Sequence, residues 1–152
     1  MALSGYSNRL EITIDSSYIP TTISGCPVTL TGEAFTSAFF SAMQTDGKDL
    51  RFSSDSSGTT ELPRDIQYVD TTGEDIVVHV KIDSFTASTD KTIYAWCGNG
   101  NVEEPLPRGD SGAQSVWQDC FGSSVSYYGV LHCQDDPDDG TIVSGDTGYK
   151  AG

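Results

Sequence analysis

Residues 75–83 alternate between apolar side chains and a second, mixed set, a period that a β-strand satisfies and a helix does not. The apolar face comprises Ile76, Val78, Val80 and Ile82. The opposite face carries Val77, His79 and Lys81. The alternation predicts a strand with one face buried in a core, and it restricts the chain to folds that contain a sheet with two different faces.

Several other segments have the same character. Residues 9–15 place Leu10, Ile12 and Ile14 on one face, and shorter strands are predicted at 26–31, 50–53, 66–70 and 92–97. Pro27 cannot donate to a central ladder, so it belongs at the start of its strand or on a sheet edge. Turn sequences separate these runs at regular intervals, which predicts an all-β, jelly-roll-like β-sandwich.

One segment departs from the strand pattern. Phe35, Phe39 and Met43 recur every four residues, with alanines beside them and no internal Gly or Pro. This spacing predicts a short amphipathic α-helix over 33–43, which Asp46 and Gly47 would end.

The 152 residues suffice for one domain with a core of its own. We expect that core in residues 1–103, because the chain turns polar and rich in Pro and Gly over 102–114. Residues 104–152 are then an extension, whose last eight residues have little to bury alone. We expect the extension to pack on the core or on a neighbouring subunit, in an oligomer or a larger assembly.

Eight basic and 22 acidic residues give a formal charge of −14. Such a surface repels nucleic acid and anionic membranes, and it suits a basic protein partner, Ca²⁺, or simple solvation. The first residues lack the basic and apolar pattern of a signal peptide, and no later stretch is long and apolar enough to span a membrane. We therefore expect synthesis in a cytoplasm.

Four cysteines, Cys26, Cys97, Cys120 and Cys133, are too far apart for a zinc motif. Buried free thiols are expected, and a bridge between Cys120 and Cys133 only outside the cell.

Motifs for catalysis and cell adhesion are short and isolated. Gly109-Asp110-Ser111-Gly112 spells a serine-protease nucleophile motif, but His79 and His132 lack the context of a catalytic base. Arg108-Gly109-Asp110 spells an integrin-binding tripeptide, which three residues define poorly. We interpret both as loop sequences and predict that the protein is not an enzyme.

The sequence suggests two further kinds of site. Asp135, Asp136, Asp138 and Asp139 bring carboxylates together, as a weak Ca²⁺ site requires, although the EF-hand pattern fails and a solvated acidic turn is the simpler interpretation. Asp46 and Asp49 are interpreted as part of a turn first and as metal ligands second. Stacking surfaces for sugars are candidates at Trp96, Trp117, Tyr127 and Tyr128, with core or interface positions as the alternative.

Four blocks follow one another in the sequence: residues 8–15, 26–28, 47–52 leading into 61–63 and 66, and 81–82 through 93–99. In this order they resemble a bacterial and phage family known as domain of unknown function 2341. Together they span residues 6–101. Val116-Trp117 and Val130-Leu131-His132 look like the stretch after this domain, where a lectin-like sandwich commonly begins. Cys26, His79 and Cys97 stand where the family usually has aromatic residues, which weighs against a glycan site built on those aromatics.

The resemblance implies a β-sandwich in surface-exposed, glycan-associated or phage-structural proteins, without an established chemistry. We therefore expect a phage virion component, either a capsid decoration (cement) protein or a tail protein, that adheres to the major capsid protein or to tail proteins. The alternative is a carbohydrate-binding or adhesin module at the cell surface or outside the cell.

Overall fold

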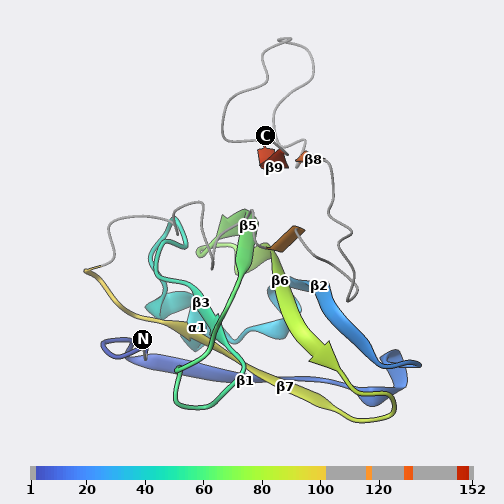
Figure 1. Ribbon diagram of the computed structural model, residues 1–152. Coiled ribbons are helices and arrows are strands. Elements are labelled where there is room, and N and C mark those ends of the chain that lie inside the picture. Colours follow the sequence, from blue (N-terminus) through green and yellow to red (C-terminus); the bar gives the residue numbers. More distant parts are fainter. Residues whose placement is uncertain (1–2, 102–115, 118–128, 132–146, 151–152) are drawn as a thin grey trace.

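The protein is a β-sandwich of two antiparallel sheets (Figure 1). In this computed structural model, residues 3–101, 116–117, 129–131 and 147–150 are described, the last two ranges as backbone only. The prediction of a mostly-β sandwich with one short helix is confirmed.

The larger sheet has the order β1-β7-β3-β4. Its strands are β1 (Asn8–Ile14), β7 (Lys91–Cys97), β3 (Arg51–Ser53) and β4 (Glu61–Leu62). β1 and β7 pair along their whole length, from Asn8 opposite Cys97 to Ile14 opposite Lys91. The two-residue strand β4 was not predicted, because two residues are too few to show a period.

The second sheet has the order β2-β6-β5. Its strands are β2 (Ile23–Thr31), β6 (Asp75–Phe85) and β5 (Arg64–Asp70). The predicted inner face of β6 is confirmed, since Ile76, Val78, Val80 and Ile82 are fully buried. Pro27 lies inside β2 rather than at its start, and β2 tolerates it because it is an edge strand.

The helix is shorter than predicted. A 3₁₀ turn, η2 (Gly32–Ala34), comes first, Phe35 is extended, and the α-helix α1 spans only Ser37–Ala42. The helix begins there because the Thr36 hydroxyl accepts a hydrogen bond of 3.3 Å from the Phe39 N–H. Phe35, Phe39 and Met43 are all buried as the spacing indicated, although Phe35 and Met43 are not helical.

The core lies between the two sheets and is closed on one side by the chain itself. There β4 runs through Pro63 directly into β5 of the other sheet. On the opposite side the edges are β1 and β2, and the connection between them, with the 3₁₀ turn η1 (Ser16–Tyr18), crosses only at one end. A separate hairpin joins β8 (Gly129–Leu131) and β9 (Thr147–Lys150).

Candidate functional site

An apolar pocket of about 180 Å³ lies on the side where the sandwich is bounded by β1 and β2. Its lining is almost wholly hydrophobic and comes from both sheets and their connection: Ile14, Tyr18, Ile19, Ile23, Cys26, Val28 and Phe85. Side chains that face the core of each sheet therefore reach the surface here, because no further strand covers them on this side of the described structure.

Tyr18 stands at this pocket with 81% of its surface exposed, the largest exposure of any bulky hydrophobic residue described. The local sequence holds it there. Asp15 caps η1 by accepting a hydrogen bond of 2.6 Å from the Ser17 N–H, and Asp90 accepts one of 2.8 Å from the Ser16 N–H. The adjacent Ile19 is buried and anchors the turn, whereas the preceding residue, Tyr18, faces solvent.

Sequence reasoning missed this pocket. The only local signal is the pair Tyr18-Ile19 between two serines and a proline, which has no period to assign it to either face. The pocket forms because β1, β2 and the end of β6 come close together in the folded chain. The residue pattern within one strand cannot predict that proximity.

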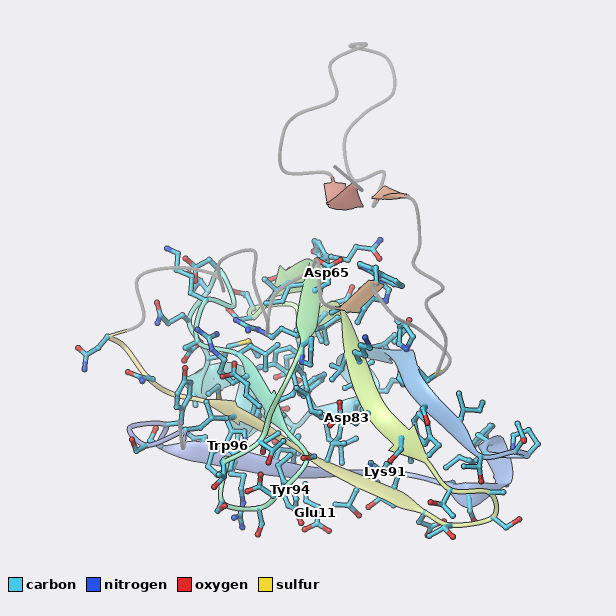
Figure 2. The ribbon with its side chains drawn as sticks, viewed as in Figure 1. Glu11, Asp65, Asp83, Lys91, Tyr94 and Trp96 are labelled. Carbon is cyan, nitrogen blue, oxygen red and sulfur yellow. The ribbon has the colours of Figure 1, made fainter. Side chains whose placement is uncertain are left out.

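A second arrangement of aromatic and charged side chains, partly exposed, lies on the outer face of the larger sheet. In the register of the two strands, Tyr94 and Trp96 of β7 lie opposite Glu11 and Arg9 of β1. Figure 2 shows Glu11, Tyr94 and Trp96. The Arg9 guanidinium carbon lies 5.4 Å from the Tyr94 ring centre and 5.7 Å from that of Trp96, which is the range of a cation–π contact. Trp96 is only 9% exposed, and its N–H donates a hydrogen bond of 2.7 Å to the Ser53 hydroxyl.

Trp117, a predicted stacking residue, packs on the outer face of the second sheet, against residues of β5 and β6, and is only 8% exposed. Its N–H donates a hydrogen bond of 2.8 Å to the Asp65 carboxylate, and its ring centre lies 5.0 Å from that of His79. His79 is on the outer face of β6, as predicted, and its ring nitrogens contact Thr29 and Gln67. These contacts make Trp117 part of the packing of this face, while a role in sugar binding stays a prediction.

The acidic turn after α1 acts as a structural brace. Gly47 takes a positive φ of +67°, which permits the tight turn. Asp49 is fully buried, and its carboxylate accepts hydrogen bonds from the N–H groups of Gln44, Gly98 and Asn99 at 2.7 to 3.1 Å. Its oxygens therefore join this turn to the end of β7. The described residues contain no group of three or more His, Cys, Asp or Glu side chains arranged to hold a metal.

Two of the four cysteines lie in the described structure, and both are free thiols. Cys97 is completely buried, as expected for a small hydrophobe, and burial raises the pKa of its thiol to about 12. Cys26 is half-buried against the core and lines the apolar pocket. The surroundings of Cys97 therefore oppose formation of a thiolate.

The remaining predicted site residues lie outside the described residues. They are Tyr127 and Tyr128, the carboxylates Asp135, Asp136, Asp138 and Asp139, the cysteines Cys120 and Cys133, His132, and the motifs within 108–112. None of the described helices is long and apolar enough to cross a membrane.

Comparison with known proteins gives one match. The model of the family described as domain of unknown function (DUF2341) matches residues 46–116, slightly under half of the chain. The match begins after the blocks at 8–15 and 26–28, so their resemblance stays an interpretation, and it runs beyond the predicted boundary at 103. No curated protein and no solved structure matches the chain.

Proposed function

We propose that this chain is a non-enzymatic adhesion domain that docks on another protein of a larger assembly. Its specific form in this proposal is a virion component, either capsid decoration (cement) or tail protein. The observation that carries the proposal is the exposed Tyr18 beside an apolar pocket at the β1 and β2 edges. An exposed aromatic residue next to an apolar depression is typical of the centre of a protein–protein interface.

The proposed partner inserts an apolar side chain into the pocket and surrounds it with basic residues. The pocket offers aliphatic walls from both sheets, and the exposed carboxylates Asp15 and Asp90 lie next to the Tyr18 turn. With a formal charge of −14, the chain would attract a basic rim over a distance and repel an acidic one. The partner's backbone can also extend the sheet at the edge of β2, which pairs with no further strand in the described structure.

A particle-incorporation experiment tests this function. Cells that encode the chain produce virus particles with either the wild-type protein or Tyr18→Ala, and mass spectrometry measures its copy number per major capsid protein in density-purified particles. We expect high copy number for the wild type and at least a tenfold loss for Tyr18→Ala. Removal of a central aromatic anchor typically costs 2 kcal/mol or more, and about 1.4 kcal/mol is already tenfold.

Tyr68→Ala is the matched control. Tyr68 is the other bulky hydrophobic residue described as exposed, at 43%, and it lies on β5, the opposite edge of the same sheet. Its removal should leave incorporation unchanged. Absence of the wild-type chain from particles would reject the virion assignment, and equal incorporation of both variants would reject the pocket as the docking site.

A glycan-binding or adhesin module is the second candidate, and the outer face of the larger sheet favours it. The half-buried Tyr94 ring lies there next to Glu11 (Figure 2). Its other neighbours are the exposed Arg9 and the buried Trp96. Flat rings flanked by hydrogen-bonding groups suit the CH-rich faces of sugars. Under this function Tyr94→Ala abolishes retention on immobilised polysaccharides and Tyr18→Ala does not. No retention of the wild type on any glycan would exclude it.

A further inference from the structure

Two arginines and one glutamate meet where β4 crosses into β5, on the side of the sandwich away from the apolar pocket. Arg51 is 5% exposed and Arg64 is 3% exposed. Both approach the same carboxylate oxygen of Glu61, Arg51 through Nε at 3.4 Å and Arg64 through Nη1 at 4.0 Å. One carboxylate therefore serves two buried cations.

Among the described residues Arg51 has further hydrogen-bond partners, whereas two nitrogens of Arg64 have no acceptor. The Nη1 group of Arg51 donates hydrogen bonds to the carbonyl oxygens of Lys48 and Leu50 at 2.7 and 2.8 Å. In the described part of the chain, no atom accepts a hydrogen bond from Nε or Nη1 of Arg64. The Glu61 oxygen that both arginines approach also lacks a hydrogen bond. Buried guanidinium donors without acceptors cost free energy. They are therefore uncommon in proteins unless a water or a ligand accepts their hydrogen bonds.

Within the described structure, the carboxylates near Arg64 leave two of its nitrogens without acceptors. At direct range two guanidinium groups face one carboxylate, that of Glu61. The Asp49 carboxylate balances the second positive charge only at longer range, and its oxygens accept backbone hydrogen bonds, so it does not satisfy the donors of Arg64. Burial, with Arg51 next to it, lowers the pKa of the Arg64 guanidinium to about 9, so the group stays charged at neutral pH.

The cluster lies just beneath the surface rather than deep in the core. The Glu61 side chain keeps 24% of its exposure, and the half-buried Tyr6 is close enough for Arg51 and Arg64 to affect its pKa, which burial raises. Glu61, the partly exposed member of the cluster, lies 4.0 Å from Arg64, so we expect a small ligand to approach Arg64 from the side of Glu61.

We propose that Arg64, with Arg51 and Tyr6 beside it, binds a small monovalent carboxylate. A guanidinium group and a carboxylate are complementary in shape and charge, and the oxygens of the carboxylate would accept hydrogen bonds from Nε and Nη1 of Arg64, which have no acceptors among the described residues. A doubly charged anion fits less well, because the chain as a whole carries a formal charge of −14. This site is independent of the proposed docking surface.

Thermal unfolding of the full chain tests the proposal, with acetate replacing chloride at pH 7 and constant ionic strength. A ligand that binds only the folded state raises Tm saturably, by about 3 to 6 °C at ten times its Kd for a chain of this size. We expect this rise for the wild type and for Lys91→Met, which removes a cation elsewhere. Arg64→Met should lose the response, and in chloride it should be at least as stable as the wild type, because it removes a buried charge whose Nε and Nη1 groups lack hydrogen-bond acceptors while Arg51 remains paired with Glu61.

Arg64→Lys provides a second variant if the methionine protein does not fold. It keeps the charge but not the planar donor group, so its response to acetate should fall below that of the wild type. Line broadening of ¹³C-labelled acetate in the presence of the wild-type protein measures binding without reference to unfolding. A wild-type Tm that does not rise with acetate, or an equal rise in the wild type and the Arg64 variants, would overturn the proposal.

Discussion

The indole N–H of Trp117 donates a hydrogen bond of 2.8 Å to the carboxylate of Asp65, 52 residues earlier in the chain. Both groups are buried, and the Trp117 ring also lies against His79 on the outer face of β6. The contact attaches a residue beyond position 101 to the sandwich. The hydrogen bond also engages the indole N–H of Trp117, a residue predicted to form a stacking surface for sugars.

Loss of this hydrogen bond should destabilise the fold. Trp117→Phe keeps most of the ring but removes the donor to a charged acceptor, which costs about 1.5–3 kcal/mol. Trp96→Phe is the matched control, because it removes a neutral bond to Ser53 and should cost about 1 kcal/mol. Urea unfolding measures both, and an equal effect of the two substitutions would contradict the assigned role of Asp65.

Asp49→Asn should weaken the connection between the turn after α1 and the end of β7. The amide that replaces the carboxylate has one acceptor oxygen, while three backbone N–H groups now donate to Asp49. We expect a loss of about 2–4 kcal/mol in the free energy of unfolding, measured in urea. The exposed Asp46, three residues earlier, is the control, and Asp46→Asn should change stability by less than about 0.5 kcal/mol.

Asp55 should make the stability of the protein fall in acid. Hydrogen bonds from the Ser57 side chain and from the N–H groups of Thr59 and Thr60 hold the pKa of this exposed carboxyl group well below its ordinary value. A lowered native pKa means that the stabilisation is complete above about pH 5, where the unfolded carboxyl group is also ionised, and is lost as the pH falls toward the native pKa.

Urea midpoints for the wild type and Asp55→Asn, measured from pH 6 to pH 2, test this dependence. The difference between the two proteins should be constant above about pH 5 and narrow below about pH 4. Asp83→Asn removes an exposed charge on β6 without touching this loop, and controls for net charge. A difference that persists unchanged to pH 2 would show that the Asp55 hydrogen bonds do not depend on its ionisation.

Cys97 should resist alkylation in the native protein. Its thiol is fully buried and has a pKa raised to about 12, whereas Cys26 is half-buried at the surface pocket. At pH 8, iodoacetamide should therefore modify Cys26 well before Cys97, because only the thiolate reacts and only Cys26 is reachable. Peptide mass spectrometry measures both sites, and labelling in urea, where both should react at similar rates, is the control. Early modification of Cys97 under native conditions would imply that this part of the core opens readily.

The strand pattern and the buried face of β6 could be predicted because each depends on a period within one short segment. Ile76 and Val78 lie two residues apart and face the core for the same local reason. The helix was placed correctly but extended too far, since Phe35 and Met43 contribute to its buried face without helical backbone. The spacing of the apolar residues indicated which side chains are buried, whereas the hydrogen bond to the Thr36 hydroxyl determines where the helix begins.

The candidate sites depend on relationships that no single segment contains. The pocket at Tyr18 exists because β1 and β2 end up as the edges of two different sheets on the same side of the sandwich. The pairing of Arg51 and Arg64 with Glu61 follows from the passage of the chain from one sheet to the other. Sequence alone determined the alternation, the acidic charge and the mostly-β class, because these are sums or periods of local residue properties. Tertiary structure alone decided which apolar side chains stayed uncovered and which charges were buried together, because both depend on how the two sheets meet.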